Sequence, residues 1–273
     1  MGMNDELRDL YNAWKVVLPQ NQQPPRDLGP PYLVKVTPDY EISPKRVLVI
    51  GQEDYGWKWS TRELSDDLTG YTYKENGKEW PHLPIESWGD FIEQPNSVDA
   101  LMYGCEIFEF GKEQPKSFNS PLWQRFRDIT NQGDIGAFTN LDRASYFDGE
   151  RSGTIPDGPV REYLTTQDFP DPEAKLLLRE IQILGPTVCI FLTGHGSDHL
   201  IEAALPKVEF EECVTNLPRE QIARVCGPGL PLASYRTYHP GHLSRCAKGF
   251  YLDLICKDIA RQASSKAAVE PNA

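Results

Sequence analysis

The 273-residue chain carries 28 Lys and Arg against 40 Asp and Glu, which gives a formal net charge of -12 at pH 7. Its 39% content of hydrophobic residues is ordinary for a soluble globular protein long enough to bury a large core. The charge disfavours a simple nucleic-acid coat protein, whose affinity would come from many phosphate contacts, but it allows a local basic face. No apolar run approaches the roughly 20 residues of a membrane span, and the acidic N-terminus does not resemble a signal sequence. We therefore expect a cytoplasmic protein with no membrane partner.

The six cysteines are scattered and form neither a CxxC pair nor a compact metal-binding spacing: Cys105, Cys189, Cys213, Cys226, Cys246 and Cys256. This spacing argues against structural zinc and against an iron–sulfur cluster. We expect reduced thiols, no metal and no cofactor.

The first third of the chain alternates regular and irregular segments. Residues 4–17 place apolar side chains at helical spacing, and a proline-rich link follows at 19–31. The β-branched run at 47–50 predicts a strand buried on both faces. Residues 57–107 then form a long insert with many turn formers and aromatic residues, which predicts a functional insert or a small subdomain.

Regular patterns return after residue 119 and alternate between strands and helices. We expect helices at 120–129, 172–184 and 197–205, strands at 136–141 and 187–194, a last strand and a loop within 232–245, and a closing helix after residue 246. This alternation predicts an α/β fold, a three-layer α/β/α arrangement around a central, mostly parallel four-stranded sheet. The expected organisation is an N-terminal helix and link at 1–43, an α/β domain with its insert at 44–262, and a disordered tail at 263–273.

The stretch "RVLVIGQEDYGW" runs from a hydrophobic strand directly into two carboxylates, Glu53 and Asp54. Ligands of open α/β sheets bind outside the carboxyl ends of the strands. Because acidic turns also follow core strands without any function, this stretch by itself leaves a structural and a functional interpretation open.

Four strand ends together resemble the uracil-DNA glycosylase superfamily. "GQEDY" is similar to the GQDPY water-activating motif, "FTNL" to the strand ending in a base-reading Asn, "CIFLTGHGS" to FLLWGK, and "HPGHLS" to the HPSPLS loop. The order of all four agrees, and the resemblance covers about residues 44–258 apart from the insert. It implies an enzyme that flips a base out of DNA and hydrolyses its N-glycosidic bond.

The resemblance also implies roles for individual residues. A carboxylate at Glu53 or Asp54 and a donor at His239 would stabilise the charges that develop as the bond breaks. The base would contact residues in and directly after the first two motifs, together with Phe110 at the position of the family's stacking Phe: Gln52, Tyr55, Trp57, Phe110, Asn140 and Asp142. DNA would contact the last motif and the residues beside it: His242, Leu243, Ser244, Arg245 and Lys248. Leu243 would enter the base stack as an apolar wedge, unless it is a core residue of the closing helix.

The departures from the family put the substrate in question. The family's Asp and Pro are Glu53 and Asp54 here, so either carboxylate could be the catalytic one, and His242 is an addition. The enlarged, aromatic-rich insert favours a bulky base such as the glucosylated hydroxymethylcytosine that anti-phage members excise, although its rings could equally serve packing. Uracil excision, a catalytically inactive DNA-binding module and a nucleoside hydrolase stay open as alternatives, as do substrate strandedness and oligomeric state.

Overall fold

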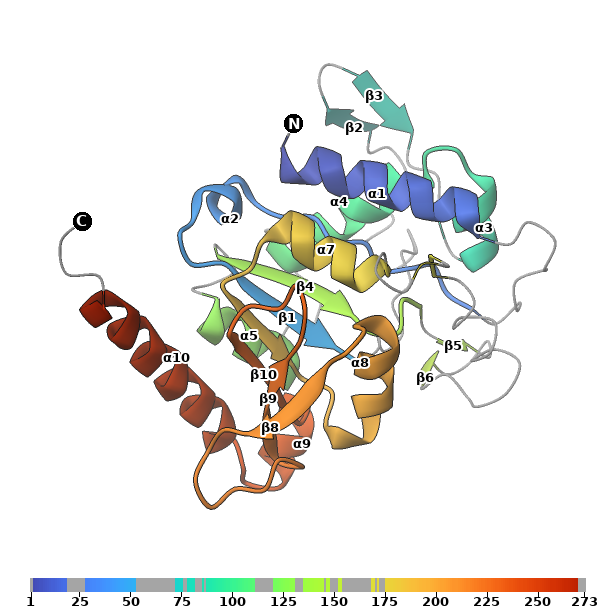
Figure 1. The fold of residues 1–273 in the computed structure, drawn as a ribbon. Coiled ribbons are helices and arrows are strands. Elements are labelled where there is room, and N and C mark those ends of the chain that lie inside the picture. The colour runs from blue at the N-terminus through green and yellow to red at the C-terminus, as the bar shows by residue number, and fades with distance from the viewer. Residues whose placement is uncertain are drawn as a thin grey trace. The chain divides into compact units, whose positions relative to one another are not determined.

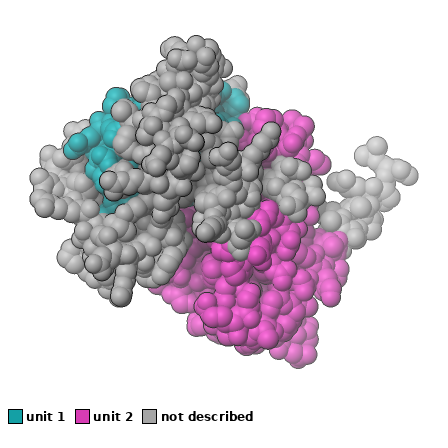
Figure 2. Space-filling view, turned by 180° about the vertical axis from the view of Figure 1, so that it is seen from behind, with its two compact units in different colours: residues 1–35, 53–115, 142–170 teal, residues 36–52, 116–141, 171–273 magenta. Residues whose placement is uncertain are grey.

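The structure is a computed structural model, and it describes most of the chain. The described residues are 2–18, 28–52, 72–75, 78–81, 85, 87–110, 120–130, 135–144, 146–147, 152–153, 168–169, 171 and 175–269. Two compact units, coloured in Figure 2, are interleaved along the sequence. Unit 1 comprises residues 1–35, 53–115 and 142–170, and unit 2 comprises residues 36–52, 116–141 and 171–273.

Unit 2 contains a six-stranded sheet with the order β4-β1-β7-β10-β9-β8. Its strands are β1 (Val47–Gly51), β4 (Gly136–Asn140), β7 (Val188–Phe191), β8 (Glu209–Glu212), β9 (Ile222–Cys226) and β10 (Ala233–Thr237). The first four strands in the sheet order are parallel, and β9 and β8 are added antiparallel at one edge. All residues of β1, β4, β7 and β10 are buried, which agrees with the apolar runs in the sequence.

Helices cover both faces of this sheet. They are α2 (Pro38–Ile42), α5 (Pro121–Ile129), α7 (Leu176–Leu184), α8 (Asp198–Ala204), α9 (Pro240–Arg245) and α10 (Phe250–Val269). In Figure 1, α7 and α8 lie on the viewer's side of the sheet and contact each other, while α5 lies behind and contacts β4 and α9. Right-handed crossovers explain why the helices lie on both faces of the sheet. The crossover from β1 to β4 and the crossover from β4 back past β1 to β7 run in opposite directions, so their helices lie on opposite faces.

Local sequence signals fix several helix ends of unit 2. Ser120 accepts a hydrogen bond from the Trp123 backbone N–H, and Pro121 occupies the first turn of α5. The α7 helix ends at Gly185, which adopts a left-handed conformation with a φ of 48° and donates its N–H to the carbonyl of Ile181. The first cap fixes where α5 begins, and the second sets where the chain leaves α7 for β7.

Unit 1 has its own aromatic core. It contains α1 (Met3–Val17), α3 (Trp88–Glu93), α4 (Ser97–Phe110) and the two-stranded sheets β2 (Thr72–Glu75) with β3 (Lys78–Pro81) and β5 (Tyr146–Phe147) with β6 (Ser152–Gly153). The rings of Trp14 and Trp88 pack edge to face with centroids 5.6 Å apart, and Phe91 packs against both rings. The N-terminal helix therefore belongs with the insert and not with a separate N-terminal segment.

The mixed α/β class and the mostly parallel sheet are confirmed, and several details of the sequence prediction are wrong. The sheet has six strands instead of four, because β8 and β9 were not predicted. The expected loop after β10 contains α9, and α10 continues to Val269 through most of the tail expected to be disordered. The insert includes β2, β3, α3 and most of α4. None of the helices in the described residues is long and apolar enough to span a membrane.

Candidate functional site

Four strand ends of unit 2 meet at one edge of the sheet, which we call the carboxyl edge. Gly51 pairs with Asn140, and Phe191 is level with both Ile50 and Arg236, so β4, β1, β7 and β10 end close together. Helices after β1 and after β7 lie on opposite faces of the sheet. In open α/β sheets, ligands bind outside the strand ends at such a reversal.

Asn140, at the end of β4, is a buried polar side chain with unmet hydrogen-bonding capacity. Its side chain is fully buried, and neither Oδ1 nor Nδ2 has a hydrogen-bond partner among the described residues. A buried amide without partners is costly, since it loses its hydrogen bonds to water and gains none in return. Native proteins keep such groups mainly where a ligand or water supplies the missing partner.

Gly51 makes room for the Asn140 amide. An ideal Cβ placed on Gly51 would lie 2.3 Å from Asn140 Oδ1 and 3.0 Å from Phe138 Cζ. Any larger residue at position 51 would displace the amide or the ring. The glycine that ends β1 and begins the first motif therefore has a specific steric reason, and that reason is the asparagine that ends β4.

An aromatic cluster packs beside Asn140 on the same face of β4. Phe138 lies two residues before Asn140, and its ring packs 4.9 Å from Trp123 and 6.2 Å from Phe126 of α5. Thr139 points to the opposite face, where its hydroxyl donates a hydrogen bond of 3.2 Å to the buried carboxylate of Glu180 on α7. The strand thus separates an apolar, Asn-containing face from a polar interaction with α7.

His239 caps the start of α9 directly after β10, and its tautomer follows from its contacts. The Gly241 backbone N–H donates to Nδ1 over 3.0 Å, so Nδ1 carries no proton and the neutral ring holds its proton on Nε2. Partial desolvation of the ring, and then the nearby Arg245 and His242, lower the pKa of His239 below its ordinary value of 6.5. Near neutral pH the ring is therefore an uncharged donor through Nε2, and the residue remains exposed to a ligand.

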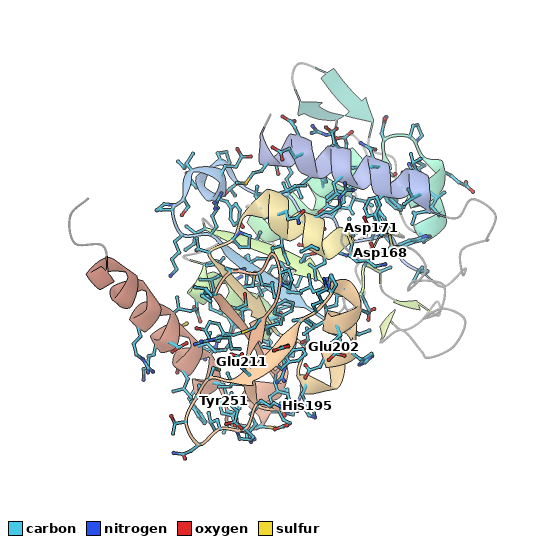
Figure 3. All side chains as sticks on the ribbon, viewed as in Figure 1. Asp168, Asp171, His195, Glu202, Glu211 and Tyr251 are labelled. Atoms are coloured by element: carbon cyan, nitrogen blue, oxygen red, sulfur yellow. The ribbon has the colours of Figure 1, made fainter. Side chains whose placement is uncertain are left out.

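Three aromatic rings surround the start of α9. The Tyr238 ring stacks on His242 with centroids 4.7 Å apart and meets the exposed His195 edge to face. The Tyr238 hydroxyl lies 3.3 Å from His195 Nδ1. Figure 3 shows His195 at the end of the sheet where α9 begins. Sequence reasoning missed Tyr238 and His195, because neither stands at a position where the family motif assigns a role.

A buried ion pair holds two of these strand ends together. Arg236 of β10 places Nε 2.9 Å from Asp198 Oδ1, and its terminal nitrogen Nη2 donates to Oδ2 over 3.0 Å. The other terminal nitrogen donates to the carbonyl of Glu220. Partial burial raises the pKa of Asp198, and Arg236 opposes that rise. The pair fixes the turn after β7 to the segment that carries His239.

The remaining predicted residues are distributed unevenly. Gln52 is half-buried at the end of β1, and Ser244 and Arg245 are exposed on α9. Asp142 is buried and belongs to unit 1. Phe110 is the last residue of α4, and its side chain lies outside the described part. Four predicted residues lie outside the described residues: Glu53, Asp54, Tyr55 and Trp57.

Burial bears on two residues for which the sequence left a structural and a functional interpretation open, Leu243 and the insert residue Trp88. Leu243 is only 1% exposed in α9, which contacts α5. This burial favours the alternative in which Leu243 is a core residue, because a wedge must be free to enter the base stack. Trp88 is fully buried against Trp14 and Phe91, so it packs the core of unit 1 and does not line a pocket.

The strand ends supply hydrogen-bonding and aromatic groups. Within the described residues, no three His, Cys, Asp or Glu side chains gather as ligands of a metal ion would. No protein-family model matches the chain, and no curated protein matches it. The chemistry of the carboxyl edge is therefore the guide to function.

Proposed function

We propose that the protein is a monofunctional DNA glycosylase that flips a modified base into the crevice at the carboxyl edge and hydrolyses its N-glycosidic bond. The unpartnered Asn140 amide is the observation that carries this proposal. An amide offers both a donor and an acceptor, which suits the edge of a pyrimidine base. Gly51 preserves the space that the amide needs.

The chemistry needs one group on each side of the breaking bond. The bond from C1′ to the base nitrogen breaks with positive charge on the sugar and negative charge on the base, and water then forms the new bond to C1′. His239 Nε2–H would donate to a base oxygen as negative charge develops there. A carboxylate of Glu53 or Asp54, which follow Gln52 in the sequence, would stabilise the sugar cation.

The two groups flank the crevice instead of touching each other. Three inter-strand spacings of about 4.8 Å separate β4 from β10, roughly 14 Å in all. A planar base bound between the two strands would then be contacted from both sides. Asn140 would read one edge of this base, and His239 would bind the oxygen on the other edge.

The segment that contains α9 is basic, although the chain as a whole is acidic. Arg245 is exposed on α9, and Lys248 follows three residues later, so the segment that begins α9 is basic. Acidic residues gather instead on the outer strand β8, where Glu209, Glu211 and Glu212 are exposed. A basic segment beside His239 suits the phosphates on either side of a flipped nucleotide.

We infer a bulky pyrimidine, glucosylated hydroxymethylcytosine, as the preferred substrate. This inference rests on the length of the insert and on the altered first motif. Trp88 packs in the core of unit 1. The insert's aromatic residues that support a bulky substrate are therefore Trp59, Tyr71, Tyr73 and Trp80. Uracil is the smaller alternative, and a DNA-binding module without activity is the outcome if neither carboxylate functions.

The test is release of free bases from a panel of DNAs. The full chain is incubated with duplex and single-stranded DNA containing uracil, glucosylated hydroxymethylcytosine or unmodified bases, and the released bases are identified by mass spectrometry. We expect release of the bulky base, and a loss on the order of a hundredfold or more in rate for His239→Ala with little loss of DNA affinity. Borohydride should trap no covalent adduct, because water is the nucleophile.

Each other outcome contradicts a different part of the proposal. Binding without release of any base would support the inactive module, and release from free nucleosides would support a nucleoside hydrolase. Rapid release of uracil alone would replace the substrate assignment. A His239→Ala variant that retains the wild-type rate would overturn the role of His239.

A further inference from the structure

We propose that the His242 ring, supported from below by Tyr238, is a stacking surface for the nucleobase that loses its neighbour when the target base is flipped out. This inference rests on the proposed function, and it names the residue that holds the gap in the DNA stack. Because Leu243 is buried, a different side chain of the α9 segment must perform this task.

The position of His242 on α9 supports this assignment. Leu243 points into the core, whereas His242, one residue earlier, keeps part of its surface exposed. The His242 and Tyr238 rings are nearly parallel, with an interplanar angle of 29° and centroids 4.7 Å apart. One face of the imidazole is therefore occupied by Tyr238.

The support beneath His242 is rigid. Tyr238 lies against the backbone of Gly194, where an added Cβ would come within 3.2 Å of Tyr238 Cδ1. The Tyr238 hydroxyl contacts His195, and His242 Nε2 lies 3.6 Å from Cys246 Sγ. A ring held on one face and at its edge binds another ring with little loss of side-chain freedom.

The surroundings match a nucleobase better than another aromatic ligand. Arg245 is exposed on the same short helix and supplies a cation for a backbone phosphate. Base–aromatic stacking tolerates every base, because each base presents a π-face. The stack therefore gives affinity for a gap in DNA irrespective of the sequence around it.

The experiment compares four full-length proteins, the wild type and the variants His242→Ala, His242→Phe and His199→Ala. Affinity is measured by anisotropy for a duplex with a tetrahydrofuran abasic-site analogue and for the same intact duplex. We expect His242→Ala to weaken binding of the abasic duplex by between about 5-fold and 100-fold, with a much smaller change for the intact duplex. His242→Phe should restore binding, and His199→Ala, which removes an exposed histidine of α8, should match the wild type.

A fluorescent base gives an independent readout of stacking. 2-Aminopurine placed next to the abasic site should be quenched by the wild type and by His242→Phe, and should stay bright with His242→Ala. If His242→Phe fails to restore binding or quenching, the imidazole acts through hydrogen bonds or charge and the stacking inference is overturned. The same conclusion follows if His242→Ala binds abasic DNA as tightly as the wild type.

The Leu243→Ala variant tests whether Leu243 is the wedge, and the wild type tests the proposed function itself. Leu243→Ala should lower the free energy of unfolding, as expected for a truncated core residue, while abasic-site affinity at a temperature below unfolding stays close to that of the wild type. A stable Leu243→Ala protein with lost affinity would return the wedge role to Leu243. If the wild type neither binds abasic DNA nor releases any base, the proposed function fails and this inference fails with it.

Discussion

Arg236 and Asn140 are both buried polar side chains near the carboxyl edge of one sheet, yet their environments differ. Arg236 has a carboxylate partner in Asp198 and donates to a backbone carbonyl. Asn140 has no partner among the described residues for either amide atom. Burial without partners costs stability, whereas a partnered buried charge positions two chain segments. Arg236 therefore stabilises the site, whereas the Asn140 amide would obtain its hydrogen-bond partners from a ligand.

The largest expected effect is on stability, at the Arg236 pair. Asp198→Ala leaves a guanidinium that is 1% exposed without its carboxylate, while Asp198 itself is 25% exposed. Breaking a fully buried pair costs about 3–5 kcal/mol, and the partial exposure of Asp198 reduces this to about 2–3 kcal/mol. Urea denaturation should show this loss in the free energy of unfolding. Glu202→Ala is the control, because Glu202 is an exposed acid on α8, the helix that carries Asp198. It should change the free energy of unfolding by less than about 0.5 kcal/mol. Equal stability of the two variants would show that the pair does not hold the strand ends together.

The second expected effect is on activity, at Asn140. Asn140→Leu replaces an unpartnered amide with an apolar side chain of similar size. The free energy of unfolding should stay the same or rise by about 1 kcal/mol, while base release should fall on the order of a hundredfold. Thermal unfolding and single-turnover release measure the two quantities on the same samples.

Thr139→Val is the matched control for Asn140, since it lies one residue earlier and faces the opposite side of β4. It removes the hydrogen bond to Glu180, so it should lower the free energy of unfolding by about 1–2 kcal/mol and leave base release nearly unchanged. The comparison between partnered and unpartnered groups would be contradicted if Asn140→Leu were the destabilised variant and Thr139→Val the inactive one.

The smallest expected effect is the pH dependence of base release. The neutral His239 ring carries the donor proton, and its pKa lies below the ordinary value of 6.5. The single-turnover rate should therefore be independent of pH in the neutral and mildly alkaline range and fall only at acidic pH, because protonation of Nδ1 removes the acceptor of the Gly241 N–H that orients the ring. Arg245→Gln removes a nearby cation that lowers this pKa, so the acidic limb should move to higher pH. A limb centred above pH 6.5 in the wild type would contradict a neutral donor.

Local patterns predicted the parallel core of unit 2 well. The apolar runs at β1, β4 and β7 and the spacing of α5, α7 and α8 appear in the sequence because burial on both strand faces and on one helix face leaves a periodic signal. The outer strand β8 leaves no such signal, since three of its four residues are exposed glutamates. Its pairing with β9 depends on a neighbour and not on its own hydrophobicity.

The sequence by itself determined which polar residues stand at the ends of these strands. Strand order in a parallel sheet then brings Gly51, Asn140, His195 and His239 to one edge, since every such strand ends on the same side. Only the tertiary structure decided that Leu243 is buried, that His242 stacks on Tyr238 and that the Asn140 amide lies over Gly51 with no partner in the described part of the chain. These features arise from packing between segments far apart in the chain, and a local pattern of residue types contains no information about such contacts.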